Sequence, residues 1–317
     1  MKEFNIVFLA VLPVLLTVLA GVALRRSNCL TEEADKSLLD LTVNLLIPCF
    51  IFDKLLGNPA LNEPSNLLLG PLIGFMTVVV GMLVALSLAS FTGLKDPLER
   101  KTFGFSAGMY NYGYIPLPLA LSLFGDATAA TLVVYNVGVD FAFWVMGAII
   151  FAQRDQPIWK KLLRPPIFAI VFTVFLNLAG LAESVPELFI RTARMIGACA
   201  IPMGLILSGA MVGDLLKEFR MSGGAQVMAT ACVVRLLILP VGFLLVARYL
   251  PMSLELKQVV VLQAAMPSAI FTILAAKYFQ AHPPTALRVV MSTSIIAFIT
   301  IPIWIRLGMQ FAGLESK

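Results

Sequence analysis

Helix-breaking residues gather inside one hydrophobic stretch of this chain, where a membrane helix would otherwise continue without interruption. The stretch holds glycines, an asparagine and two prolines, namely Gly104, Gly108, Asn111, Gly113, Pro116 and Pro118. A second, milder break, Ala265-Met266-Pro267-Ser268, follows about 155 residues later. Broken helix at membrane depth is tolerated only inside protein or against a watery cavity. Two breaks at corresponding places in two halves predict the substrate site of a transporter.

The chemistry that the first break could do is anion binding. Pro116 and Pro118 remove two backbone donors, and the residue before each proline disfavours helix. The half-helix that follows presents unpaired N–H groups and the positive end of its dipole, and Asn111 adds a donor and an acceptor. If the breaks cross, two such helix ends point into one site that suits carboxylates. The alternative is a plain proline kink.

Two charges, Asp140 and Arg235, fall near the middle of their hydrophobic segments. Ionisable residues are costly inside a membrane and indicate function by default. If the two pair, a static salt bridge is one interpretation. The other is a switch in which protonation of Asp140 frees Arg235 for a carboxylate and so couples transport to protons.

The composition predicts an integral membrane protein. The 317 residues are 59% hydrophobic and 13% charged, whereas a soluble domain carries roughly 25% charged residues. The net charge of +5 is spread over loops, so it indicates no nucleic-acid partner. The four cysteines lie far apart, the single histidine, His282, lies in a short His-Pro-Pro loop, and no nucleotide-binding loop is present. We therefore expect no enzyme activity and no cofactor, with H⁺ or Na⁺ as the coupling ion.

A helix that crosses a membrane needs about 20 apolar residues, and the chain has ten segments of about that length. The sequence therefore predicts an all-α membrane protein with ten helices. The expected segments are 4–24, 37–56, 67–92, 102–124, 127–151, 164–182, 187–213, 223–250, 255–278 and 284–311. Prolines inside four of them, Pro13, Pro48, Pro202 and Pro240, predict kinks. One set of alternate loops carries thirteen Lys and Arg residues, and the set on the opposite side of the membrane carries eight. The densest group is Lys160, Lys161 and Arg164. This bias places both termini outside the cytoplasm.

The two halves of the chain repeat each other. Pro48 corresponds to Pro202, and Phe124 corresponds to Phe279, at an offset of about 155 residues. Five helices in a half is an odd number, so the second half must be inverted relative to the first. The boundary is expected between residues 151 and 152, giving repeats 1–151 and 152–317. Inverted repeats supply the two interchangeable conformations of alternating access.

Several motifs resemble those of the auxin efflux carrier family, whose bacterial branch includes malate and malonate permeases. In the first half they are Leu12-Pro13…Gly21…Leu24-Arg25, Leu46-Ile47-Pro48…Phe52 and Asn111-Tyr112-Gly113…Pro116-Leu117…Leu123-Phe124-Gly125. In the second half they are Ile201-Pro202…Leu207-Ser208-Gly209, Ala265-Met266-Pro267…Ala275-Ala276…Tyr278 and Ser292-Thr293-Ser294. The resemblance covers nearly the whole chain. It also implies membership of the wider bile acid, arsenite and riboflavin transporter superfamily, to which that family belongs.

The resemblance implies ten helices, with broken helices 4 and 9 that cross. It also implies a dimerising scaffold domain from helices 1, 2, 6 and 7, and a moving transport domain from helices 3–5 and 8–10. It indicates Asn111 and Asn136 as polar substrate contacts, although Asn136 could equally make a structural bond between helices. Together with the breaks, the expected substrate-binding residues are Asn111, Tyr112, Gly113, Pro116, Asn136, Gln263, Pro267 and Ser268.

The leading hypothesis is a secondary transporter of small organic anions that works by an elevator-type movement. It would be a homodimer in the lipid bilayer of the inner (plasma) membrane. A dicarboxylate would need a second cation, which Arg235 could supply; an auxin-like acid would need aromatic walls, which Tyr110, Tyr112, Tyr114 and Phe271 could supply. The compact length favours the dicarboxylate branch by resemblance. The alternatives are a sensory or ligand-gated membrane protein, a channel, and a sodium-coupled carrier similar to the bile acid symporters.

Overall fold

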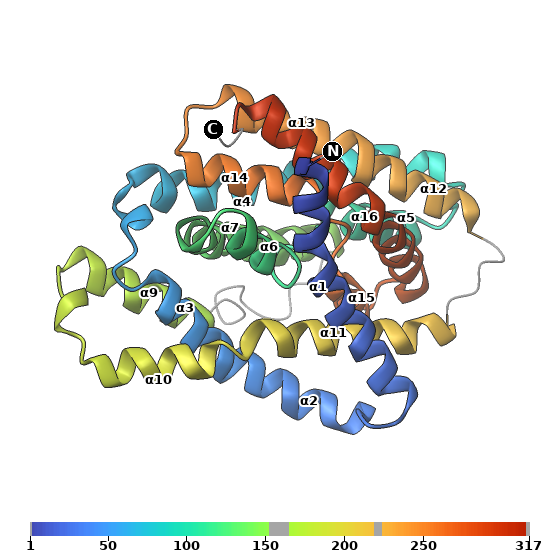
Figure 1. Ribbon diagram of the computed structural model, residues 1–317. Coiled ribbons are helices and arrows are strands. Elements are labelled where there is room, and N and C mark those ends of the chain that lie inside the picture. The colour runs from blue at the N-terminus through green and yellow to red at the C-terminus, as the bar shows by residue number, and fades with distance from the viewer. Residues whose placement is uncertain (1, 152–164, 219–223, 315–317) are drawn as a thin grey trace.

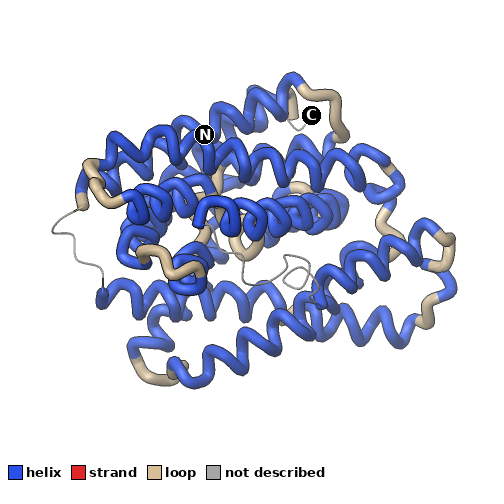
Figure 2. Tube along the Cα trace, turned by 180° about the vertical axis from the view of Figure 1, so that it is seen from behind, coloured by secondary structure: helices blue, strands red, loops and turns tan. Residues whose placement is uncertain are grey.

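The computed structural model describes residues 2–151, 165–218 and 224–314, and within these ranges helices are the only regular elements (Figures 1 and 2). This confirms the expected all-α class. Among the described residues, five helical segments are long and apolar enough to cross a membrane: Ser65–Thr92, Asp126–Phe151, Glu187–Asp214, Ala225–Tyr249 and Pro283–Ala312. The basic loop expected around Lys160, Lys161 and Arg164, and the expected repeat boundary after Phe151, lie outside the described residues.

The first half contains α1 to α7 and several shorter turns. The elements are α1 (Lys2–Arg26), α2 (Glu32–Leu41), η1 (Thr42–Leu46), α3 (Ile47–Leu55), η2 (Pro59–Asn62), η3 (Ser65–Leu69), α4 (Gly70–Ser87), η4 (Leu88–Thr92), α5 (Pro97–Gly108), α6 (Pro116–Leu123) and α7 (Asp126–Phe151). Asp96 caps α5 by accepting a hydrogen bond from the amide of Leu98. The predicted helix 4 is thus split into α5 and α6.

The described part of the second half contains α9 to α16 and two shorter turns, η5 and η6. They are α9 (Pro165–Leu178), η5 (Ala182–Ser184), α10 (Glu187–Gly197), α11 (Ala200–Glu218), α12 (Ala225–Val233), η6 (Val234–Ile238), α13 (Leu239–Tyr249), α14 (Leu254–Ala264), α15 (Phe271–Tyr278) and α16 (Pro283–Ala312). The predicted helix 9 is split into α14 and α15, which are 11 and 8 residues long.

Proline positions explain most of the irregular helical turns. Three π-helical turns, η1, η3 and η6, each end two residues before a proline, which is Pro48, Pro71 or Pro240. A wider turn accommodates a residue that lacks an amide proton and clashes with the carbonyl one turn earlier. Before Pro202 the helix is interrupted between α10 and α11. Helix α1 continues through Pro13 without a change of helix type.

The helices form two groups, which Figures 1 and 2 show from opposite sides. In the view of Figure 1, α2, α3, α9, α10 and α11 lie below, and α4, α5, α7, α12, α13, α14 and α16 lie above. Helix α1 runs between them and packs along α11. Within the upper group, α4 and α7 approach closely, because a Cβ on Gly138 would lie only 1.7 Å from the carbonyl oxygen of Pro71.

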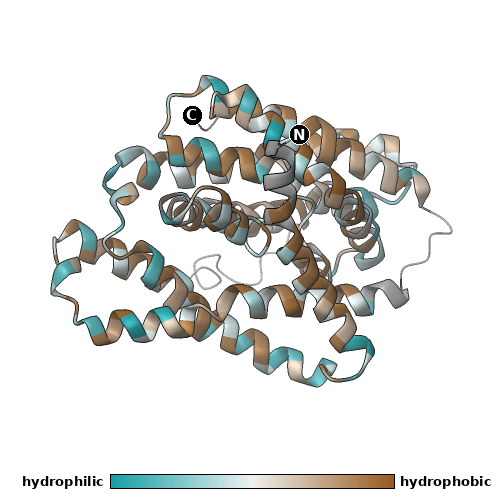
Figure 3. Cartoon of the chain, in the orientation of Figure 1, coloured by the Kyte–Doolittle hydropathy of each residue, from teal (hydrophilic) through white to brown (hydrophobic). Residues whose placement is uncertain are grey.

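Hydrophobic residues run along most of the helices, as the brown colour in Figure 3 shows. Large hydrophobic side chains project from several helices, with Phe175 60% exposed, Ile299 69% exposed and Ile149 66% exposed. Water would penalise so much apolar surface, whereas lipid does not. The surface therefore agrees with a protein that sits in a membrane.

Candidate functional site

The two breaks meet in the interior of the upper group. The amide of Asn111 donates to the carbonyl oxygen of Pro267 at 2.8 Å, and the amide of Ala269 donates to the carbonyl oxygen of Met109 at 3.1 Å. These bonds form an isolated antiparallel bridge between Tyr110 and Ser268. Residues more than 150 positions apart in sequence thus satisfy each other's backbone groups where both helices stop.

Side-chain amides hold the backbone of the first break. Asn136 of α7 donates from Nδ2 to the carbonyl oxygen of Tyr112 at 2.8 Å. Gln263 of α14 donates from Nε2 to the same oxygen at 3.3 Å and to Oδ1 of Asn136 at 3.4 Å. The hydroxyl of Tyr112 donates to Oδ1 of Asp140 at 2.6 Å. Because Asn136 and Asp140 lie one turn apart on α7, this helix contacts Tyr112 at both its backbone and its ring.

A cavity of about 400 Å³ opens beside the first break. One side is formed by the break itself, α7 and the start of α15, and the other by α2, η1, α3, α9 and α11. Five of the expected site residues line it: Asn111, Tyr112, Gly113, Asn136 and Asp140. The remaining five do not line it: Pro116, Arg235, Gln263, Pro267 and Ser268. The first break therefore forms part of the cavity wall, whereas Pro267 and Ser268 of the second break do not contact the cavity.

The backbone of the first break offers hydrogen-bond donors to this cavity. The amides of Gly113 and Tyr114 make no hydrogen bond to any described residue, and both residues line the cavity. A Cβ on Gly113 would meet no atom within 4 Å, so the space beside it is open. Pro116 starts α6 and, with Pro118, leaves the first turn of that helix without two donors. The amides that remain for a ligand are thus those just before α6.

Arg235 has a different environment from the one expected. Its side chain is completely buried, and its Nε donates to the carbonyl oxygen of Met266 at 3.0 Å. Its Nη2 donates to the carbonyl oxygen of Gln263 at 3.4 Å. The guanidinium carbon lies 5.2 Å from the ring centre of Tyr110 and 5.4 Å from that of Phe243, a cation–π geometry.

A pairing of Asp140 with Arg235 is not found among the contacts that Arg235 makes with described residues. Asp140 borders the cavity and accepts from Tyr112, whereas Arg235 is enclosed behind the crossing. The static bridge and the proton switch both require that contact. The arrangement therefore supports neither of them.

Comparisons with known proteins identify the family of this chain. The sequence profile of the membrane transport protein family matches residues 6–159 and 155–305. The chain belongs to this family. It is the auxin efflux carrier family that the sequence motifs indicated. An uncharacterized transporter of Methanothermobacter thermautotrophicus is 26% identical over 306 residues, which cover 93% of this chain and 96% of that protein. An uncharacterized transporter of Methanocaldococcus jannaschii is 22% identical over 301 residues, with the same coverage. The family and these relatives are named for transport.

Part of the transporter's cavity wall was not among the expected site residues. Ile47 and Ile201 precede Pro48 and Pro202, and both line the cavity, as do Phe50 and Ser208. The signal was present in the sequence, since the repeat aligns the two Ile-Pro pairs. The repeat alone does not say that helices 2 and 7 face helix 4, so the sequence indicates the pairs as kinks and as family motifs but not as cavity wall.

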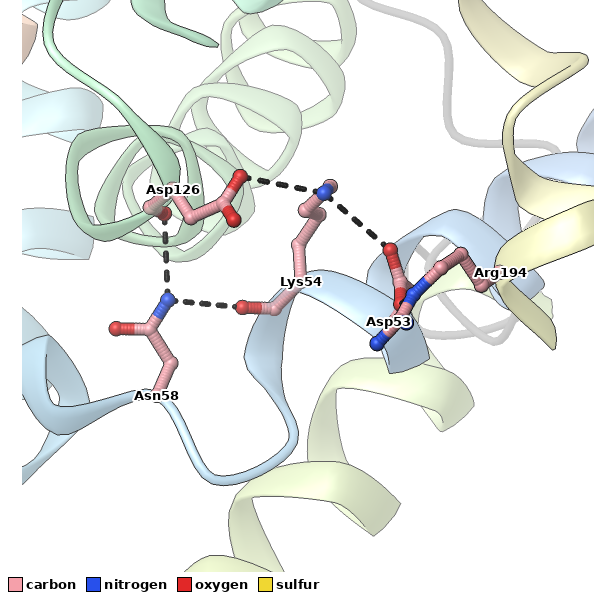
Figure 4. Close-up of polar contacts among 5 residues, drawn as sticks. All are labelled: Asp53, Lys54, Asn58, Asp126 and Arg194. Carbon is pink, nitrogen blue, oxygen red and sulfur yellow. Dashed lines mark hydrogen bonds and ion pairs between the residues drawn. The ribbon is translucent and has the colours of Figure 1, made fainter. Parts of the chain in front are cut away.

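A cluster of charges joins the two helix groups of the transporter at one end (Figure 4). Lys54 of α3 lies 3.2 Å from Oδ1 of Asp126 at the start of α7 and 3.3 Å from Oδ2 of Asp53. Arg194 of α10 lies 2.9 Å from Oδ1 of Asp53. Asn58 donates to the carbonyl oxygens of Lys54 and Asp126 at 3.0 and 3.2 Å. These contacts connect α3 and α10 of the lower group to α7 of the upper group.

Proposed function

We propose that this protein is a secondary transporter of small organic anions, and that a carboxylate binds in the cavity beside the first break. The observation that carries the proposal is the cavity of about 400 Å³ between the two helix groups, with the first break in its wall. Substrate sites of secondary transporters lie where discontinuous helices meet. Family membership supports transport as the activity.

The donors for a carboxylate come from the first break and α7. The amides of Gly113 and Tyr114 are unused by the described residues, and Asn111 and Asn136 present side-chain amides at the same wall. Backbone N–H groups before a helix bind carboxylates well, because they add to the positive end of the helix dipole. No cofactor and no covalent step is needed for this function.

The cavity favours a carboxylate with an apolar body. Its walls include Val43, Phe50, Ile170, Trp144 and Phe271, and no Lys or Arg occurs among the described residues that line it. The dicarboxylate preference depended on Arg235 as a second cation, and Arg235 lies outside the cavity. We therefore expect an auxin-like acid such as indole-3-acetate to be carried in preference to malate or malonate.

Transport would occur by movement of one helix group against the other. In this proposal α4–α7 and α12–α16 form the transport domain, and α1–α3 with α9–α11 form the scaffold domain, each built from both inverted repeats. The cavity between the groups is lined mainly by apolar side chains, which slide with little loss of directional bonding. The scaffold would dimerise, both termini would lie outside the cytoplasm, and the protein would reside in the plasma membrane.

The test is uptake of radiolabelled acids into proteoliposomes. Indole-3-acetate, malate and malonate are compared with and without a proton gradient, for the wild type and for Asn111→Ala. Asn44→Ala is the matched control, because Asn44 is an exposed residue of η1 outside the cavity. Saturable uptake of one acid, lost in Asn111→Ala and kept in the control, is the expected result. Absence of saturable uptake and of counterflow for all three acids would overturn the proposal and favour a sensory protein.

A further inference from the structure

The feature that the cavity does not explain is a fully buried positive charge. Arg235 has no exposed side-chain surface, and no carboxylate pairs with it among the described residues. A charge buried without an opposite charge needs other strong partners. Its partners are the carbonyl oxygens of Gln263 and Met266 and the faces of Tyr110 and Phe243.

A π-helical turn brings Arg235 to this position. Arg235 belongs to η6, in which the three consecutive residues Val234, Arg235 and Leu236 are all buried. Leu237 and Ile238 follow on the outside, where they are 54% and 42% exposed. A π turn widens the helix and places residues inward that a regular helix would rotate away, and such turns occur at functional sites.

The carbonyl oxygens that Arg235 binds are those of a helix end. Helix α14 ends at Ala264, so the carbonyl groups of Gln263 and Met266 lie at or just beyond its C-terminus. The last carbonyls of a helix lack intrahelical partners and carry the negative end of the dipole. In transporters with broken helices, these carbonyl oxygens coordinate the coupling cation.

The guanidinium also contacts the first break through Tyr110. The hydroxyl of Tyr110 lies 2.9 Å from that of Thr77 on α4 and 3.0 Å from that of Tyr135 on α7. Tyr110 itself pairs with Ser268 across the crossing. Arg235 therefore touches both breaks, the second through carbonyl oxygens and the first through an aromatic ring that α4 and α7 hold in place.

We propose that Arg235 is a positioning residue whose fixed positive charge holds the second break in shape, where a coupling cation would otherwise coordinate the carbonyl oxygens of Gln263 and Met266. Arg235 does not line the cavity, so it acts on the substrate through the crossing. This role rests on the proposed function insofar as the crossing forms one wall of the substrate site. It follows that transport does not require sodium at the second break.

The first test measures backbone protection and needs no substrate. Hydrogen exchange is followed by mass spectrometry on the full-length protein in lipid nanodiscs, for the wild type, Arg235→Met and Arg235→Lys. Arg248→Met is the matched control, because Arg248 is an exposed arginine on α13 of the same helical segment. Met keeps most of the length of the side chain and removes its charge, whereas Lys keeps the charge.

We expect exchange at residues 264–271 to increase about tenfold or more in Arg235→Met, with α1 and α11 unchanged. Arg235→Lys and Arg248→Met should stay within about twofold of the wild type. Wild-type exchange in Arg235→Met would overturn the proposal, as would an equal increase in every helix. If Arg235→Met gives no folded protein, Arg235→Lys decides. Protection of 264–271 close to that of the wild type supports a positioning charge, and exchange raised throughout overturns it.

The second test is uptake with sodium replaced by choline. The wild type should transport equally in both, and Arg235→Met should lose most transport while Arg235→Lys retains a measurable part. A sodium requirement in the wild type would overturn the proposal. If no carboxylate is transported but the exchange pattern is as expected, the proposed substrate class fails and the role of Arg235 stands.

Discussion

The two breaks have the same design in sequence and different environments in the folded protein. Each ends one helix and begins an eight-residue one, α6 or α15. The first break faces the cavity, and its carbonyl group at Tyr112 accepts from two neutral amides. The second break is buried, and its carbonyl groups accept from the charged Arg235. The two breaks therefore differ in exposure: residues of the first line the cavity, and Pro267 and Ser268 of the second do not.

The largest expected effect tests how tightly the first break is packed. A Cβ on Gly108 would lie 2.4 Å from both Cα and N of Met82, and neither backbone atom can rotate away. Gly108→Ala should therefore destabilise the protein by about 3 kcal/mol. Gly113→Ala is the matched control, because its new methyl group would enter open space.

The measurement is the melting temperature of each purified variant in the same detergent. Gly113→Ala should melt close to the wild type, and Gly108→Ala should melt several degrees lower or fail to accumulate. Equal melting temperatures would show that α4 and α5 can move apart at little cost, and the first break would then be a loose element.

A smaller effect is expected when the first break loses its hydrogen bond from Asn136, a neutral amide, to the carbonyl oxygen of Tyr112. Asn136→Leu removes the donor of the 2.8 Å bond to the Tyr112 carbonyl oxygen, which also accepts from Gln263 at 3.3 Å. The loss should be about 1–3 kcal/mol in stability, since a partly buried acceptor loses its shorter hydrogen bond. Uptake should fall together with stability, because Asn136 also lines the cavity.

Unfolding monitored by intrinsic fluorescence, with Asn44→Leu alongside, measures this cost. A stability loss for Asn136→Leu larger than that for Arg235→Met would reverse the comparison between the two breaks. The neutral amide of Asn136 would then stabilise the protein more than the charge of Arg235.

The smallest effect is expected at the second break itself. The hydroxyl of Ser268 is buried and has no hydrogen-bond partner among the described residues, while its amide donates to Thr293. Ser268→Ala keeps that amide bond and removes only the hydroxyl, so stability should change by less than about 0.5 kcal/mol. Uptake should remain close to that of the wild type, in contrast to Asn111→Ala. Loss of uptake in Ser268→Ala, at unchanged melting temperature, would mean that the second break contacts the ligand directly.

The sequence predicted the features that depend on local chemistry. Glycine and proline stop helices wherever they occur in numbers, so the breaks near Asn111 and Pro267 were found, as were the irregular turns before Pro48 and Pro240. The environment of Arg235 could not be predicted, because it depends on the π turn of η6 and on carbonyl groups 28 and 31 residues away. Part of the apolar cavity wall could not be predicted for the same reason, since Ile47 and Ile201 reach the site only through the packing of the two groups.

The charge cluster at the start of α7 affects the energetic cost of the movement proposed for that helix. One helical turn is about 5.4 Å, so a shift of α7 by one turn would separate Lys54 from Asp126, which are 3.2 Å apart. Asp126 is 66% exposed, and exposed ion pairs contribute only about 0–1 kcal/mol. Thermal energy at ambient temperature is about 0.6 kcal/mol, so this contact would oppose the proposed movement of α7 only weakly. Raising the salt concentration should weaken it first, which makes ionic strength a simple means of shifting the resting conformation.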